Sequence, residues 1–254
     1  MSDNNFDFNL ICDFFSHLAQ QGPGSPAETI KALSFIGELP ADAKIADIGC
    51  GTGRQTQTLA ENTTVDIVAV DVFPGMIGGL NDRVKRLGLE NRITGLVASM
   101  DNLPFSENEY DLIWSEGAIY NIGFEKGIRE WKKYLKPGGF LVVSEATWFR
   151  GNRPEAIEKY WIDAGYAEID TVSVKISQLE QAGYVPVASF NLPESCWLDS
   201  YYKPITEFSG QFLIRNNNSE QAKWLIDNLA QEIAYYEKYK EYYGYTFFIA
   251  QKVE

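Results

Sequence analysis

The chain has 254 residues, of which 45% are hydrophobic, and its 35 acidic residues outnumber its 22 Lys and Arg, giving a net charge of −13. This length accommodates one large α/β domain, or a domain with an appendage, and the apolar content is ample for a core. The acidic excess argues against a nucleic-acid partner, because such binding depends on Lys and Arg neutralising phosphates. The three cysteines lack C-x-x-C spacing, so they predict neither a disulfide framework nor a metal site.

Membrane and targeting signals are not expected. No apolar run in the sequence approaches the roughly 18 residues that a membrane span requires. The first ten residues, MSDNNFDFNL, are acidic and polar, whereas a secretory signal is basic and then apolar. We therefore expect a cytoplasmic protein with no membrane partner.

Residues 1–40 are expected to form an N-terminal helical segment. Apolar residues between 10 and 18 follow helical spacing: Leu10, Ile11, Phe14, Phe15 and Leu18. Ser25 to Glu28 resembles a capping box, with Pro26 at the first position of a helix expected to end near Ile36. His17, the single histidine, lies beside the apolar stripe and is a candidate general base, although a packed or surface histidine fits the same pattern.

The segment Lys44 to Thr56, KIADIGCGTGRQT, predicts a strand, a tight glycine turn and the start of a helix. Glycines permit backbone angles that are closed to other residues, and they let a ligand approach the main chain. The N–H groups and dipole of the following helix favour an anionic or polar ligand. We expect a nucleotide-like ligand to contact Asp47, Gly49, Cys50, Gly51 and Gly53.

A second apolar strand, residues 65–70, ends at Asp71, eighteen residues beyond Gly53. An acid at that distance can accept hydrogen bonds from ribose hydroxyls, in NAD and in S-adenosylmethionine (SAM) alike. The dinucleotide fingerprint is G-x-G-x-x-G, but here the glycines run G-x-G-x-G and Arg54 stands where the last glycine would fall. This difference favours SAM and leaves an NAD(P)-dependent oxidoreductase as the alternative.

The motif DIGCGTG resembles the first motif of the class I, seven-stranded, Rossmann-like SAM-dependent methyltransferases, particularly small-molecule members of the type 11 kind. A second match, LKPGGFLVVSE, resembles the turn before the fifth strand of that family, here expected to span residues 140–145. The resemblance covers about one hundred residues, Ile45 to Glu145. It implies a three-layer α/β fold with a mostly parallel sheet and an antiparallel last strand, SAM as cofactor and S-adenosylhomocysteine (SAH) as product. It also implies that residues 1–40 form a lid over the cofactor.

The next two predicted elements, a helix and a strand, supply candidate residues for contacts with the adenine ring. The resemblance places Val72 after the acid and Met76 on a predicted helix, residues 74–87, on either side of the ring. A short third strand, residues 93–98, leads into Ser99, Met100 and Asp101. Adenine needs an acceptor for its amine and an N–H donor for a ring nitrogen, which the Asp101 carboxylate and the Met100 amide can supply.

The fourth strand, residues 110–115, ends at Ser115, and Glu116 and Tyr120 follow at its carboxyl tip. Ligands of α/β proteins bind at such tips, next to the point where the strand order reverses. We expect Ser115 and Glu116 to contact the cofactor, Tyr120 and Asn121 to orient an acceptor, and Glu116 or Tyr120 to accept a proton where one must leave. An ordinary role in loop packing is the alternative for these side chains.

The last hundred residues predict helices over 154–164 and 171–182 and a strand over 185–190. We place the SAM-binding core at 41–190, an aromatic-rich helical insertion at 191–244 and the last core strand at 245–254. The aromatic residues of the insertion fit three roles: a cap over the acceptor, a packed core or a homodimer interface.

Methyl transfer from SAM depends mainly on aligning the acceptor with the methyl group, so the shortage of histidine is no objection. The expected function is a SAM-dependent methyltransferase acting on a small molecule. A non-catalytic SAM-binding protein remains an alternative, and it predicts a featureless surface beyond the sulfonium.

Overall fold

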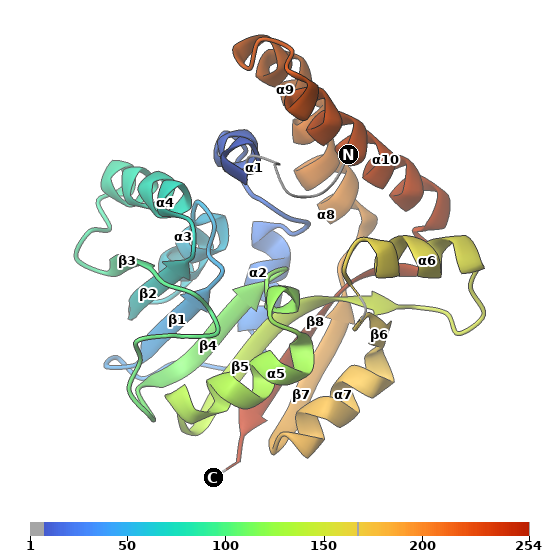
Figure 1. Ribbon diagram of the computed structural model, residues 1–254. Coiled ribbons are helices and arrows are strands. Elements are labelled where there is room, and N and C mark those ends of the chain that lie inside the picture. The colour runs from blue at the N-terminus through green and yellow to red at the C-terminus, as the bar shows by residue number, and fades with distance from the viewer. Residues whose placement is uncertain (1–7, 167, 254) are drawn as a thin grey trace.

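A computed structural model describes residues 8–166 and 168–253, so residues 1–7, which begin the expected lid and were judged to lack a signal, lie outside the described residues, as do Ala167 and Glu254. The chain forms one sheet with the order β3-β2-β1-β4-β5-β8-β7, and β6 pairs with β5 off this path (Figure 1). The strands are β1 Lys44–Ile48, β2 Asp66–Asp71, β3 Ile93–Val97, β4 Tyr110–Glu116, β5 Leu135–Trp148, β6 Asp170–Thr171, β7 Tyr184–Asn191 and β8 Tyr243–Lys252. All pairs are parallel except those of β8 with β5 and β7. The predicted α/β sheet with an antiparallel last strand is confirmed.

The strand order places a switch point between β1 and β4. The chain runs outward from β1 through β2 to β3, then returns to pair β4 on the other side of β1. Connections on the two sides therefore diverge above the carboxyl ends of these strands, which leaves space for a ligand there.

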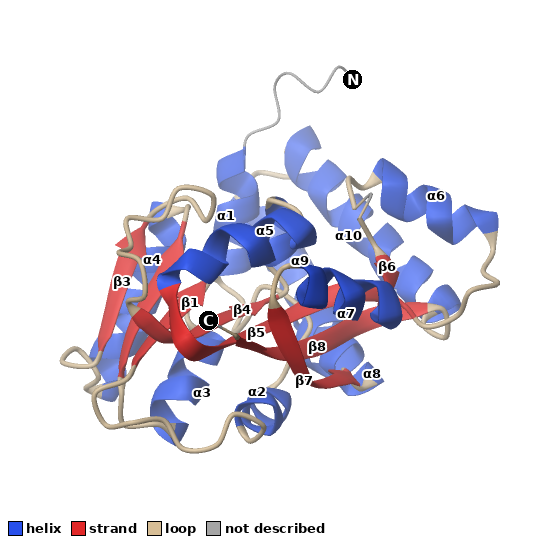
Figure 2. Ribbon diagram, turned by 90° about the horizontal axis from the view of Figure 1, so that it is seen from below, coloured by secondary structure: helices blue, strands red, loops and turns tan. Residues whose placement is uncertain are grey.

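Helices cover both faces of the sheet and divide the core into two (Figure 2). One face carries α2 Pro26–Leu33, α3 Arg54–Asn62 and α4 Pro74–Leu87, and the other carries α5 Phe124–Trp131 and α7 Val172–Gln181. Neighbouring strand residues alternate between these cores: Ile45 packs with the α3 and α4 side, and Ala46 with the α5 and α7 side. Such strands, buried on both faces, are typical of parallel sheets.

Local signals set the helix limits. The Ser25 side chain accepts a hydrogen bond from the Glu28 N–H at the start of α2, as the capping pattern predicted. Helix α4 spans the predicted residues 74–87 and ends at Gly88 in the left-handed conformation, with φ +65°. Ser219 caps the long helix α10, Glu220–Tyr239, through the Ala222 N–H.

The start of β5 differs from the prediction. The strand begins at Leu135, so the Lys136–Gly139 turn lies inside the strand's span and does not precede it. Tyr110 pairs with Leu135, but Leu112 pairs with Phe140. Between these two pairs the chain moves on by two residues in β4 and by five residues in β5, so β5 contains extra residues at this point. This bulge uses Gly138 at φ +77° and lets pairing resume after the turn. The short strand β6 was not predicted, because two residues carry no periodicity.

Helices from both ends of the chain lie above the carboxyl edge of the sheet (Figure 1). They are α1 Phe8–Ser16 and, between β7 and β8, α8 Glu194–Trp197, the π-helical turn η3 Leu198–Tyr202, α9 Lys203–Arg215 and α10. Phe14 of α1 packs on Phe208 and Phe212 of α9, with ring centroids 5.3 and 5.0 Å apart. Helix α6, Glu155–Asp163, joins them through Tyr160, which stacks on Tyr235 at 4.3 Å.

The aromatic residues of the 191–244 segment lie largely inside the chain's own core. Trp197, Tyr202, Phe212 and Tyr236 are at most 3% exposed. The packed-core role therefore accounts for these four side chains. Within the described ranges, no helix has both the length and the apolar character needed to cross a membrane.

Candidate active site

A cavity of about 690 Å³ opens at the carboxyl edge of the sheet. Its walls come from five places: the α1–α2 connection, the glycine turn, the ends of β2 and β3, the tip of β4, and the helices above the sheet. The predicted residues that line it are Gly49, Cys50, Gly51, Asp71, Val72, Met76, Ser99, Met100, Asp101, Glu116, Tyr120 and Asn121.

The glycine turn is hydrogen-bonded to β2 and has no room for a side chain at Gly49. The Gly49 and Cys50 N–H groups both donate to the Val70 carbonyl, at 2.8 and 2.9 Å. Gly49 has φ +77°, and a Cβ added there would lie 2.4 Å from the Ala118 Cβ. The main chain is therefore bare where it faces the cavity, as a closely approaching ligand requires.

Asp71 connects the end of β2 to this turn. Its Oδ2 accepts a hydrogen bond from the Gly51 N–H and its Oδ1 accepts one from the Phe73 N–H, both at 3.0 Å. Burial raises the pKa of Asp71, and the two backbone donors oppose that rise. Each carboxylate oxygen has a further acceptor position, which suits a pair of ribose hydroxyls.

The loop after β3 is held from both sides. The Trp131 Nε1–H of α5 donates to the Met100 carbonyl at 2.8 Å, and the Ser99 hydroxyl donates to Asp101 Oδ1 at 2.6 Å. The Ser99 hydrogen bond lowers the pKa of Asp101, which therefore stays an acceptor. Val72 and Met76 line the same part of the cavity, Val72 exposed and Met76 buried.

Three predicted contact residues lie behind the cavity wall. Asp47 is wholly buried, accepts a hydrogen bond from the Thr56 hydroxyl at 2.5 Å, and has its pKa raised to about 7 by burial. Ser115 is also buried and donates to the Ile48 carbonyl at 2.7 Å. Gly53 starts α3 at φ +82° and packs against Leu80. Their placement supports the turn and the strand tips and does not bring the side chains to a ligand.

Glu116 is held at the tip of β4 by two donors. Its Oε1 accepts hydrogen bonds from the Thr29 hydroxyl of α2 and from Trp114 Nε1–H, both at 2.8 Å. Burial raises the pKa of Glu116 to about 7, so this carboxyl exchanges protons near neutrality.

Tyr120 lies in a group of tyrosines. It belongs to the short helix η1, Ile119–Asn121, and its ring centroid is 4.3 Å from that of Tyr166, with a hydrogen bond between the two side chains. Burial raises the pKa of both phenols, so neither is poised to act as a phenolate base.

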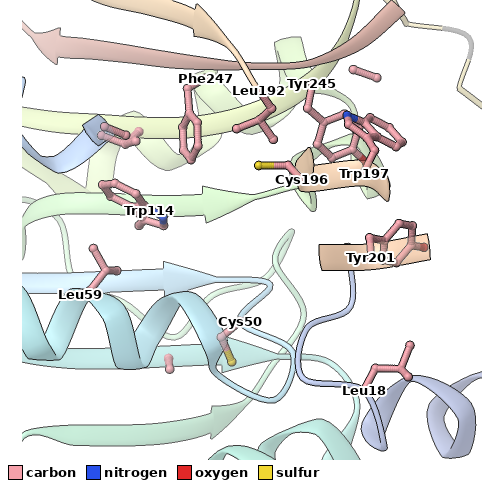
Figure 3. Close-up of a cluster of buried hydrophobic side chains, with 14 of the residues drawn as sticks. Leu18, Cys50, Leu59, Trp114, Leu192, Cys196, Trp197, Tyr201, Tyr245 and Phe247 are labelled. Carbon is pink, nitrogen blue, oxygen red and sulfur yellow. The ribbon is translucent and has the colours of Figure 1, made fainter. Parts of the chain in front are cut away.

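Tyr166, Tyr201, Leu229 and Glu232 also line this end of the cavity. None of them was named as a site residue from the sequence, although a cap over the acceptor was one of the three roles considered for the insertion's aromatic residues, which include Tyr201. Glu232 lies on α10, accepts a hydrogen bond from the Tyr202 hydroxyl at 3.1 Å, and has its pKa raised to about 7 by burial. Figure 3 shows Tyr201 and Trp197 on the helical segment beside the strands. No local motif marks these residues, because their approach depends on the packing of that segment over the sheet.

His17 lies away from the cavity. Its Nδ1 is 2.6 Å from the Asp13 carbonyl oxygen, its Nε2 contacts the Arg215 side chain, and its ring stacks on Phe208. Arg215 also pairs with Asp13 at 3.1 Å. The histidine thus joins α1 to α9, and this placement does not bring it to an acceptor.

The connection between α1 and α2 is fastened across the glycine turn. Gln21 Oε1 accepts the Thr52 N–H at 2.9 Å, and Gln21 Nε2 donates to the Thr52 hydroxyl at 3.1 Å. Arg83 of α4 donates to the carbonyls of Ala19 and Thr52 at 3.1 and 2.9 Å. The N-terminal segment therefore covers this side of the cavity.

The fold, the glycine turn and the acid after β2 are those of the class I SAM-dependent methyltransferase fold, and residues 45–139 match the family described as a methyltransferase domain. The chain therefore has the fold of this class. It is 28% identical to an uncharacterized methyltransferase, YodH, of Bacillus subtilis, over 91% of this chain and 93% of that protein. It is also 28% identical to phosphoethanolamine N-methyltransferase 1 of Triticum aestivum, over 64% of this chain and only 32% of the wheat protein.

Among solved structures, a SAM-dependent methyltransferase from Geobacter sulfurreducens in complex with SAH superposes with a TM-score of 0.83. The identity is 18%, and the match covers 95% of this chain and 97% of that chain. This likeness shows that the shared fold extends over the helices above the sheet as well as the sheet itself.

Proposed function

We propose that this protein transfers the methyl group of SAM to a small-molecule acceptor by in-line displacement. One observation carries the proposal: a single cavity is lined by the glycine turn and Asp71 on the β1–β2 side and by Glu116 and Tyr120 beyond β4. A nucleotide wall and a polar acceptor wall thus share one cavity.

The residues of the first wall suit SAM. Gly49 and Gly51 let the main chain approach the amino-acid part, and the Asp71 oxygens face outward from two backbone donors to receive ribose hydroxyls. We assign Asp101 and the Met100 loop to the adenine edge, with Val72 and Met76 beside the ring, because all four line the same cavity. This assignment leaves Asp47, Ser115 and Gly53 as supporting residues.

SAM supplies a methyl group already activated on a sulfonium, so the protein has to align the acceptor and exclude water. Thr29 and Trp114 fix Glu116 at the strand tip, and Gln21 and Arg83 hold the N-terminal segment across the turn. We assign that segment the role of a lid.

The size of the cavity supports a small acceptor, because about 300–1,000 Å³ is the usual range for small-molecule sites and this cavity has about 690 Å³. The wheat relative is named for a small acceptor, phosphoethanolamine, which is consistent with that class. A non-catalytic SAM-binding protein would have a featureless surface beyond the sulfonium, whereas here the cavity continues past Glu116 to Tyr120 and Tyr166.

Calorimetric titration of SAM and SAH tests the cofactor assignment. We expect micromolar binding to the wild type and a loss of about tenfold or more in Asp71→Ala, because ordered carboxylate contacts to hydroxyls contribute about 1.5–3 kcal/mol. Asp66→Ala, at the other end of the same strand and exposed, is the matched control and should bind normally. Failure of the wild type to bind either ligand would overturn the proposal.

A further inference from the structure

The far end of the cavity is lined by three tyrosines and two glutamates that come from five separate segments. Tyr120 belongs to η1, Tyr166 follows α6, Tyr201 lies in η3 and Glu232 lies on α10. Of these elements, α6 and α10 lie on the β5–β8 side of the molecule, away from the β1–β3 side that carries the glycine turn (Figure 1). We call these four residues, with Glu116, the acceptor wall.

The charges of this wall have one sign. Over the described parts of the chain, the charged side chains lining the cavity are Arg54, Asp71, Asp101, Glu116 and Glu232. Arg54 begins α3 directly after the glycine turn, and Asp71 and Asp101 follow β2 and β3, so these three belong to the cofactor side. The acceptor wall therefore has two carboxylates, and no Lys, Arg or His of the described residues lines it.

This pattern separates classes of acceptor. A phosphate or carboxylate group placed against Glu116 and Glu232 would meet like charges with no cation to compensate, which is costly in a partly desolvated site. A protonated amine gains both a carboxylate partner and the negative faces of aromatic rings. Neutral hydroxyl acceptors gain neither of these charge interactions.

We propose that the methyl acceptor is an amine whose other substituents carry no negative charge, received by Glu232 and the rings of Tyr120, Tyr166 and Tyr201. This inference rests on the proposed function and specifies its substrate class. Glu116 already accepts two hydrogen bonds on one oxygen, so we assign it the role of a second carboxyl group held in a fixed position and give Glu232 the direct contact.

The chemistry requires a base for such an acceptor. A protonated primary or secondary amine has no lone pair, so one N–H proton passes to the Glu232 carboxylate before transfer. The nitrogen lone pair then forms the N–CH₃ bond while the C–S bond breaks and its electron pair stays on sulfur, which yields SAH. The product nitrogen carries the positive charge that the sulfonium loses, and Glu232 releases its proton to solvent.

Calorimetry on the SAH-saturated protein tests the inference with three probes. Choline presents a methylated ammonium, 3,3-dimethyl-1-butanol has the same shape without the charge, and phosphocholine adds a phosphate. We expect choline to bind about tenfold or more tightly than the neutral isostere, and phosphocholine to bind more weakly than choline.

Variants locate the effect. Glu232→Gln should lower choline affinity by about tenfold, and Tyr166→Leu by about threefold, with SAH affinity retained in each. Glu237→Gln removes an equal charge from the exposed side of the same helix and should leave choline binding unchanged. If Glu232→Gln does not fold, the isostere comparison and Tyr166→Leu still decide the question.

The outcomes distinguish the two proposals. Normal SAH binding with equal affinity for choline and its isostere, or with tighter binding of phosphocholine, overturns the amine assignment and leaves the methyltransferase proposal intact. Absence of SAH binding to the wild type overturns the proposed function first.

Discussion

The two walls of the cavity are built in different ways. The cofactor wall comes from consecutive strand–loop units, β1 to β3, within about sixty residues, and its geometry depends on backbone conformation at a few glycines. The acceptor wall brings together Glu116, Tyr120, Tyr166, Tyr201 and Glu232, which span more than a hundred residues. The difference teaches that nucleotide binding is a local property of this chain, whereas acceptor choice depends on how the helices above the sheet pack.

The largest effect should follow from filling the cofactor wall. Gly49→Ala places a Cβ 2.4 Å from that of Ala118 at φ +77°, so the turn must shift. Strain of about 3 kcal/mol predicts a loss of SAM affinity of about 100-fold. Gly78→Ala in α4, where an added Cβ meets nothing within 4 Å, should bind SAM normally and gain up to about 1 kcal/mol of stability. Normal SAM binding by Gly49→Ala would contradict a ligand-facing turn.

In the acceptor wall, the buried carboxylate of Glu232 is expected to lower the free energy of unfolding. Burial raises the pKa of Glu232 to about 7, so the folded state holds this proton better than the unfolded state does. The preferential protonation of Glu232 in the folded state therefore adds to stability, fully below about pH 4.5, and this added stability is lost as the pH rises to about 7. Glu232→Gln should raise the free energy of unfolding in urea by about 1–3 kcal/mol at pH 8 and by little at pH 4.5. Equal effects at both pH values would show that the charge is not the cause.

A smaller effect is expected where the lid meets the cofactor wall. Gln21→Ala removes the two contacts with Thr52 and should weaken SAM binding by about five- to tenfold, chiefly through faster dissociation. Stopped-flow measurement of SAM release checks this expectation. Gln181→Ala, on the exposed side of α7, is the control. An unchanged release rate for Gln21→Ala would remove the lid role.

The smallest effect should come from the histidine. His17 lies in the α1–α9 contact with Asp13 and Arg215, outside the cavity. We expect His17→Ala to lower the free energy of unfolding by about 0.5 kcal/mol or less, as for other exposed polar contacts, and to leave SAM affinity and the rate of SAH formation unchanged within about twofold. A large loss of the rate of SAH formation with intact SAM binding would contradict this expectation and would indicate that His17 acts in catalysis.

The sequence by itself determined the parts that rest on short-range physics. The glycine turn, Asp71 and helix α4 depend on backbone angles, strand periodicity and the caps at Pro74 and Gly88, all of which neighbouring residues specify. The sheet order followed from matching these local units to a known class of fold.

Only the tertiary structure decided how distant segments meet. It placed Asp47 and Ser115 behind the wall, moved the start of β5 to Leu135, and brought Tyr166 and Glu232 to the acceptor wall. The physical reason is that the spacing of apolar residues along a helix or strand shows which of its faces is buried, but not which distant segment of the chain covers that face. The insertion between β7 and β8 folds back over the carboxyl edge because its apolar and aromatic side is buried there against α1 and the sheet, and that packing sets the chemistry at the acceptor end.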